Sequence, residues 1–152
     1  MDKQKAIELV QRNGKAVQIE AAKRRLINFA KYVNPKLDIS PFHFVYYQIL
    51  DKFAHGQIKK LIVSVPPQTG KSEGSSRILP AYLLGLNPDL KLCIGSYSAT
   101  IARDFNRDVQ RILDKEEYHD VFPATQLNNK NIVTVASNYL RNSDVFECVG
   151  RK

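Results

Sequence analysis

The stretch that most constrains the fold is "KKLIVSVPPQTGKSEGS", at residues 59–75. Residues 59–66 form a short apolar, β-branched run that ends at proline, which predicts a buried strand. Residues 71–86 have the composition of a helix, which Pro80 is expected to kink or end. A strand that passes through a Gly-Lys-Ser turn into a helix is typical of a phosphate-binding loop.

The turn between these two elements has the residue types that phosphate binding requires. Gly70 permits a close backbone approach, Lys71 supplies a cation for the β- and γ-phosphates, and the Ser72 hydroxyl is a ligand for Mg²⁺. The usual pattern G-x-x-x-x-G-K-[ST] has a glycine where Val65 stands. The two prolines of the loop fix φ and impose a rigid turn in place of that glycine. The alternative interpretation of the whole segment is a structural turn that binds no ligand. The candidate nucleotide-binding residues here are Pro67, Gln68, Thr69, Gly70, Lys71, Ser72 and Glu73.

Helices and strands are expected to alternate along the rest of the chain. Apolar spacing predicts further helices at residues 15–33, 40–56 and 98–118. Apolar runs predict further strands at residues 90–97, 131–137 and 144–150. In the second helix, Ser40 is the expected N-cap and Gly56 the expected C-cap. This order predicts an α/β fold, a three-layer αβα P-loop NTPase with a mainly parallel sheet that is incomplete at the C-terminus, after a helical N-terminal segment.

The 152-residue chain is basic, with a formal net charge of +8 at pH 7. Residues 1–33 carry eight Lys or Arg against three Asp or Glu, which is +5 of that total. A basic surplus suits a polyanion such as DNA, RNA or an anionic membrane, and a basic protein without such a partner is the alternative. No apolar run approaches the roughly 20 residues of a membrane span, so no membrane association is predicted. Cys93 and Cys148 are predicted to be reduced and intracellular.

Two motifs together give the chain a family resemblance. The loop "VPPQTGKSEGS" and the later "GSYSATIARDFNRDV" resemble the ATPase domain of the large terminase subunit of tailed bacteriophages. The similarity covers residues 38–125 and includes a Phe-His element, Phe42 and His43, which the resemblance places near the adenine base. It divides the chain into a basic helical N-terminal segment, residues 1–37, and a partial P-loop ATPase domain, residues 38–152. The nuclease domain of such proteins is absent from this chain.

The resemblance also implies a function. Terminase large subunits are motors that use ATP and Mg²⁺ to move double-stranded viral DNA into a preformed capsid. The partners implied for this chain are double-stranded DNA, the small terminase subunit and the capsid portal. A ring oligomer is implied for the full-length protein, and the implied location is the cytoplasm of an infected or lysogenic bacterial host cell.

Two departures from the family pattern limit this expectation. Many family members have arginine where Gln68 stands, and glutamine brings no charge to a phosphate. ATP hydrolysis also needs an acidic strand that positions Mg²⁺ and activates water, and nothing after Ser72 fits it. We therefore expect an N-terminal fragment that binds nucleotide without efficient hydrolysis, with the catalytic acid beyond Lys152. The alternatives are a truncated non-catalytic DNA-binding protein and a helicase-like nucleic-acid ATPase.

Several charged and aromatic residues have two interpretations. Arg103, Arg107 and Arg111 share one helix face, where they either contact DNA phosphates or pair with aspartates of the same helix. Arg77 is either a charge near the phosphates or a surface arginine. The aromatic residues of segment 42–47 either stack on bases or pack in the core, and their spread around a helix favours packing.

Overall fold

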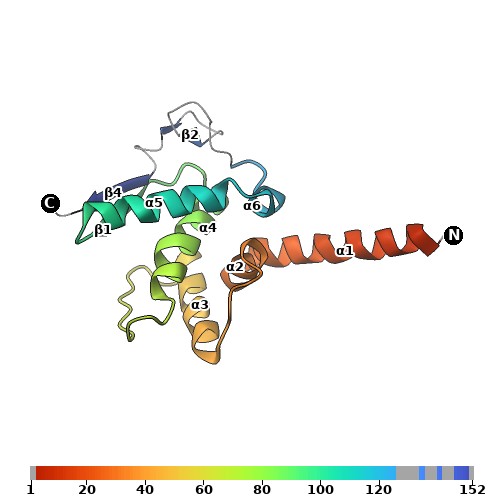
Figure 1. Cartoon of the computed structure of the whole chain (residues 1–152), viewed down its shortest axis with the longest axis horizontal. Helices are drawn as coiled ribbons and strands as arrows, with labels where there is room; N and C mark the ends of the chain where they lie inside the picture. The colour runs from red at the N-terminus through yellow and green to blue at the C-terminus, as the bar shows by residue number, and fades with distance from the viewer. Residues whose placement is uncertain (1–2, 126–133, 136–139, 142–145, 151–152) are drawn as a thin grey trace.

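The computed structural model describes residues 3–125, 134–135, 140–141 and 146–150. Its helices are α1 (Lys3–Arg24), α2 (Leu26–Val33), α3 (Pro41–Ala54), the π-helical segment η1 (Glu73–Ile78), α4 (Leu79–Leu86), α5 (Ala99–Leu113) and α6 (Glu116–Val121). Its strands are β1 (Leu92–Ser96), β2 (Thr134–Val135), β3 (Leu140–Arg141) and β4 (Phe146–Gly150). Helix α1 extends away from the rest of the chain, and β1 and β4 lie at the opposite end (Figure 1).

The structure confirms the predicted helix at residues 40–56. Ser40 is the N-cap of α3, and Pro41 occupies its first turn, where a missing N–H costs nothing. The C-cap is His55 and not Gly56, which was predicted; Gly56 follows it with φ of 73°, the left-handed conformation that commonly closes a helix. The predicted helix at 98–118 is present as two helices, α5 and α6.

The predicted helix at residues 15–33 is divided into α1 and α2 at Arg25. Arg25 has an extended backbone, with φ of −138° and ψ of 127°. Asp51 of α3 stabilises this break, because its Oδ1 accepts the Leu26 N–H at 2.8 Å and its Oδ2 accepts from Arg25 Nη1 at 3.1 Å. A side chain distant in sequence therefore caps the N-terminus of α2. The sequence around Arg25 contains no glycine or proline that would predict this break.

One helix spans residues 71–86, as predicted, but Pro80 does not end it. The hydrogen-bonding register is π over η1 and becomes α at Leu79, one residue before the proline. Proline lacks an N–H and its ring crowds the carbonyl four residues earlier, and a widened turn relieves this conflict. The wide turn lies directly after the candidate loop.

The predicted three-layer αβα P-loop fold is wrong. The described residues are mostly helical, and their strands pair only two at a time, β1 with β4 in parallel and β2 with β3 antiparallel. In the parallel pair, Leu92 lies opposite Phe146 and Ser96 lies opposite Gly150. The described part of the chain therefore has no sheet that helices cover on both faces. The strands predicted at 90–97 and 144–150 exist as β1 and β4. Of the strand predicted at 131–137, only Thr134–Val135 lies among the described residues, as β2.

The strand predicted at residues 59–66 is also wrong. This segment belongs to no helix or strand, although its side chains alternate in exposure from Leu61 onward. Leu61 and Val63 pack against the core, whereas Ile62 between them is 95% exposed. Alternation gives the segment a buried side, but a strand also needs a backbone partner, and none of the described segments pairs with it.

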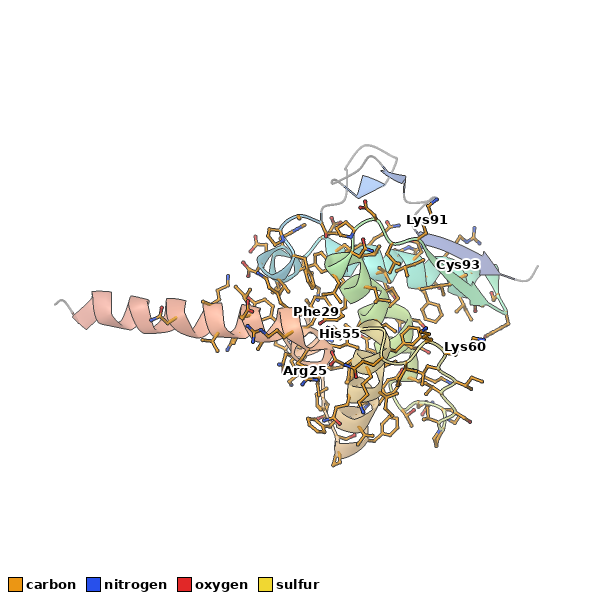
Figure 2. The ribbon with its side chains drawn as sticks, turned by 180° about the vertical axis from the view of Figure 1, so that it is seen from behind. Arg25, Phe29, His55, Lys60, Lys91 and Cys93 are labelled. Atoms are coloured by element: carbon orange, nitrogen blue, oxygen red, sulfur yellow. The ribbon has the colours of Figure 1, made fainter. Side chains whose placement is uncertain are left out.

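The core is built from helices α2, α3, α4, α5 and α6 around aromatic rings. Phe29 of α2 lies at its centre, 5.3 Å from the Tyr82 ring, 5.9 Å from Tyr118 and 5.6 Å from Phe122, measured between centroids (Figure 2). The buried hydroxyls are satisfied: Tyr82 donates to the Lys23 carbonyl at 2.9 Å and Tyr118 to the Ala81 carbonyl at 3.1 Å. Among the described residues, no helix is long and apolar enough to cross a membrane.

Candidate phosphate-binding loop

The predicted nucleotide-binding residues gather around one cavity. The cavity has a volume of about 360 Å³, and residues 66–73 together with Arg77 line it. Lys71 is exposed and Ser72 is half-buried at the point where the helix begins. The structure thus brings together all seven predicted residues of the turn, Pro67, Gln68, Thr69, Gly70, Lys71, Ser72 and Glu73.

The bend of the loop occurs at Gln68 and Gly70. Both have left-handed backbones, with φ of 60° at Gln68 and 74° at Gly70. The Thr69 hydroxyl donates to the Pro66 carbonyl at 2.9 Å and closes the turn. Left-handed backbone is costly for a residue with a side chain and free for glycine. Gln68 bears this cost and Gly70 does not. The loop thus turns at residues 68 and 70, although position 65 is not the customary glycine.

The amides at the end of the loop are available to a ligand. In the described part of the chain, no oxygen accepts a hydrogen bond from the N–H groups of residues 70–72. The first N–H groups of a helix have no intrahelical partner, and they carry the positive end of the helix dipole. Here they lie where Lys71 adds a cation that has no ion-pair partner among the described residues. An oxyanion is the chemical group that such an arrangement favours.

Helix α3 supports the loop from one side. His43 Nε2 lies 3.1 Å from the Thr69 carbonyl oxygen, and the Tyr46 hydroxyl donates to the Lys71 carbonyl at 2.8 Å. Phe42 is 38% exposed and stacks on Tyr46, with ring centroids 5.8 Å apart and planes at 9°. Neither Phe42 nor His43 lines the described cavity. His43 contacts the loop backbone, and its predicted place beside the adenine base stays a prediction, as does that of Phe42.

Arg77 lines the cavity, but two carboxylates hold it. Its Nε donates to Asp108 Oδ2 of α5 at 2.7 Å, and its Nη1 lies 3.4 Å from Glu73 Oε2. The guanidinium also lies over the Phe105 ring, 5.2 Å from its centroid. Arg77 is thus neither a free phosphate ligand nor a plain surface arginine. It joins the helix that follows the loop to α5.

The metal prediction rests on Ser72. Ser72 lines the loop cavity, and Mg²⁺ commonly combines one or two protein oxygens with phosphate oxygens and water. The described residues contain no group of three or more His, Cys, Asp or Glu side chains that could hold a metal ion. The role of Ser72 as a Mg²⁺ ligand beside a bound triphosphate therefore stays a prediction.

The arginines of α5 are mostly paired with its aspartates. Arg107 lies 3.4 Å from Asp104, and Arg111 lies 3.1 Å from Asp108, both at a spacing of three residues. Arg103 is exposed. This pairing supports the interpretation of a solvated, charge-paired helix face over that of a DNA contact.

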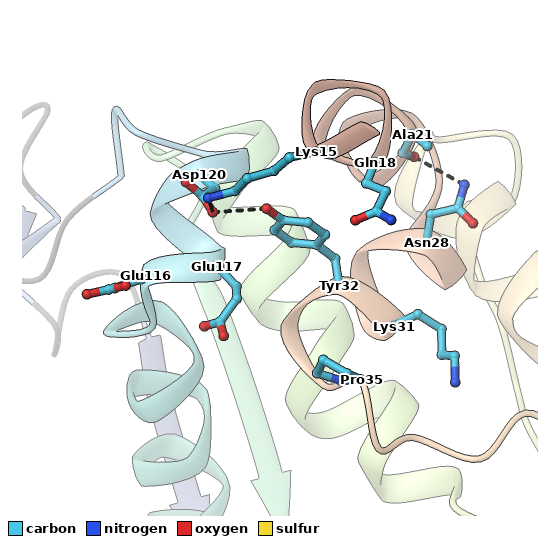
Figure 3. Close-up of a pocket in the computed structure, with 10 residues that line it drawn as sticks. All are labelled: Lys15, Gln18, Ala21, Asn28, Lys31, Tyr32, Pro35, Glu116, Glu117 and Asp120. Atoms are coloured by element: carbon cyan, nitrogen blue, oxygen red, sulfur yellow. Dashed lines mark hydrogen bonds and ion pairs between the residues drawn. The ribbon is translucent and has the colours of Figure 1, made fainter. Parts of the chain in front are cut away.

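A larger cavity, of about 670 Å³, lies between α1, α2 and α6 (Figure 3). Asp120 accepts hydrogen bonds from Lys15 Nζ at 2.8 Å and from the Tyr32 hydroxyl at 2.9 Å. Two charged groups that line this cavity, Lys15 and Asp120, are therefore paired with each other. The hydrogen bond from Lys15 holds the pKa of Asp120 below its usual range, and burial raises the pKa of Tyr32 to about 12. These contacts tie α1 and α2 to α6.

Sequence reasoning missed the supporting residues of the site. Tyr46 belongs to the aromatic segment that was predicted to pack in the core, and it is buried, but its hydroxyl also binds the loop. Asp108 was considered only as a partner within its own helix. In both cases the contact joins residues at least 25 positions apart, for which a single sequence carries no local signal.

Comparison of the chain with known protein families, with curated proteins and with solved structures gives no match. The terminase resemblance therefore stays a prediction from the motifs of the sequence.

Proposed function

We propose that residues 66–73 bind the phosphates of ATP together with Mg²⁺. The observation that carries this proposal is the set of unpaired amides at residues 70–72, which lie beside Lys71 in a cavity of about 360 Å³. The amides would bind the phosphate oxygens, Lys71 would neutralise the β- and γ-phosphates, and Ser72 would be a Mg²⁺ ligand. Gln68 contributes hydrogen-bonding capacity but no charge.

We further propose that this site serves a DNA-translocating ATPase of the terminase large-subunit type. Support comes from the sequence motifs of residues 38–125 and from the net charge of +8, which suits double-stranded DNA. A small terminase subunit and a capsid portal, a ring of subunits and a bacterial host cytoplasm belong to the same proposal. Hydrolysis would require a carboxylate that positions Mg²⁺ and activates water.

Titration calorimetry with Mg·ATP tests the nucleotide site. Lys71→Ala removes one charge-assisted interaction with phosphate, so we expect the affinity to fall about 10- to 100-fold. Lys91→Ala is the matched control, since this exposed lysine precedes β1 and is not part of the loop cavity (Figure 2). We expect it to bind Mg·ATP as the wild type does. Equal affinities of the wild type and Lys71→Ala, or no binding by the wild type, would contradict the proposal.

A further inference from the structure

Two side chains on one face of α3 contact the backbone of the loop. His43 and Tyr46 are three residues apart, a spacing that places both on the same side of a helix. His43 Nε2 reaches the Thr69 carbonyl at 3.1 Å, and the Tyr46 hydroxyl reaches the Lys71 carbonyl at 2.8 Å. The Ser75 hydroxyl also donates to the Lys71 carbonyl, at 2.9 Å.

The contacts of His43 define which ring nitrogen carries the proton. The Ser40 backbone N–H donates to Nδ1 at 3.2 Å, and the Ser40 hydroxyl lies 2.8 Å from the same atom. A backbone N–H is a donor only, so Nδ1 must accept. In the neutral ring Nε2 then carries the hydrogen, and it donates to the Thr69 carbonyl. The N-terminus of α3 therefore orients the imidazole toward the loop.

Tyr46 is held equally firmly. Its side chain is 4% exposed, and its ring stacks on Phe42. A Cβ atom at Gly74 would lie 2.6 Å from Tyr46 Cε1, so the helix after the loop packs closely on this ring. A tyrosine hydroxyl is protonated at neutral pH and can donate, and burial raises the pKa of this one further.

The two carbonyls determine where two amides point. In a trans peptide the C=O of one residue and the N–H of the next point in opposite directions. The Thr69 carbonyl turned to α3 therefore directs the Gly70 N–H away from α3, and the Lys71 carbonyl does the same for the Ser72 N–H. No α3 residue lines the described cavity, so these amides point to the ligand side of the loop.

We propose that His43 and Tyr46 are positioning residues that hold the loop amides in the geometry that binds a di- or triphosphate. This inference rests on the proposed function. The two residues touch the loop backbone and not the phosphates, and they act through the orientation of two peptide groups.

The test compares variants that keep or remove one donor. Tyr46→Phe deletes the hydroxyl alone, and His43→Leu deletes the Nε2 donor. His43→Gln is the conservative variant, because its amide places an N–H donor near the Nε2 position. Titration calorimetry with Mg·ATP and with inorganic pyrophosphate measures binding. We expect Tyr46→Phe and His43→Leu each to weaken both ligands about three- to tenfold, and His43→Gln to restore most of the loss.

Tyr32→Phe is the control that separates positioning from general stability. It also deletes a part-buried tyrosine hydroxyl, but this hydroxyl donates to Asp120 and makes no contact with the loop. We expect it to lower the melting temperature without changing either affinity. If the wild type binds both ligands and the two α3 variants bind as tightly, the positioning role is refuted while the nucleotide site stands. A loss in Tyr32→Phe equal to that in Tyr46→Phe would also refute it. If the wild type binds neither ligand, the proposed function itself fails.

Discussion

Gly70 is the residue at which the loop is most constrained. Its φ of 74° suits glycine, and a Cβ atom there would lie 2.9 Å from His43 Nε2. A side chain at this position would meet both a backbone cost and a steric one. The same atom of His43 holds the Thr69 carbonyl, so crowding at Gly70 would disturb the contact that orients the loop.

Gly70→Ala is therefore expected to lower the free energy of unfolding by more than the roughly 1–2 kcal/mol of the left-handed backbone alone. Urea unfolding followed by circular dichroism measures this loss. Gly56→Ala is the matched control, since Gly56 has φ of 73° but nothing within 4 Å of an added Cβ. The contact with His43 is the difference between them. Equal losses of unfolding free energy in the two variants would show that His43 moves away from the added Cβ without destabilising the protein.

At the residue scale, the sequence predicted the residues that line the loop cavity but not the residues that support the loop. Glycine, lysine and serine at fixed spacing have chemistry that is evident from their identity, and the structure places them around one cavity. The residues that hold the loop are His43 and Tyr46, whose contribution depends on a helix packing against it. Asp51 is similar, because it caps α2 from another helix. Contacts of this kind follow from tertiary structure.

Helix α4 packs against the core through a position where no side chain fits. A Cβ atom at Gly85 would overlap the ring of Phe122, which is 8% exposed. Tyr82 of the same helix lies 5.8 Å from that ring, measured between centroids. The close approach of α4 to the segment after α6 depends on the missing side chain.

Gly85→Ala should thus destabilise the protein by about 1–3 kcal/mol through overpacking, even though alanine favours helix by about 0.5–1 kcal/mol. Gly14→Ala is the control on α1, where an added Cβ meets nothing within 4 Å, and it should be neutral or stabilising. In a Phe122→Leu background the cost of Gly85→Ala should shrink. Thermal unfolding of Gly85→Ala, Gly14→Ala, Phe122→Leu and the double variant measures these changes in stability. If Gly85→Ala destabilises the Phe122→Leu protein as much as the wild type, the strain does not come from the Phe122 ring.

At the element scale, helices were predicted more reliably than strands for a physical reason. A helix satisfies its own backbone, so the apolar spacing of α3 and α5 suffices to predict it. A strand is completed only by a partner, and residues 59–66 have an apolar face without one among the described segments. The π register of η1 has a local cause instead, since it reconciles Pro80 with a helix that continues past it.

For the whole molecule, alternation of element types was taken to imply a layered parallel sheet, and that inference failed. The described chain is organised by helices around the aromatic residues Phe29, Tyr82, Tyr118 and Phe122. These residues come from α2, α4, α6 and the position after α6. Phe29 is more than 50 positions from the other three in sequence, so a local sequence pattern does not reveal their contact. The packing of α1 is likewise a long-range feature, since α1 reaches α6 through the Lys15–Asp120 contact (Figure 3).

This junction should make the stability of the molecule depend on pH. The hydrogen bond from Lys15, with a further one from Tyr32, lowers the pKa of Asp120 in the folded state. As pH falls below about 4, the unfolded chain takes up a proton at this aspartate before the folded chain does. The contribution of the junction is thus fully present above the unfolded pKa and is lost as pH falls through the folded one.

Urea unfolding at pH 7 and pH 3 gives the stability lost between the two pH values, to which every carboxylate with a shifted pKa contributes, and the share of Asp120 is the part that a substitution at Asp120 removes. Asp120→Asn removes the charge but keeps an oxygen that accepts from Tyr32, so its difference should be smaller than that of the wild type. Asp114→Asn, at the exposed C-terminal end of α5, is the control and should keep the wild-type difference. An Asp120→Asn difference equal to that of the wild type would mean that α1 does not dock through this carboxylate in solution. Helix α1 would then be held by its packing on α2 and by the hydrogen bond from the Tyr82 hydroxyl to the Lys23 carbonyl.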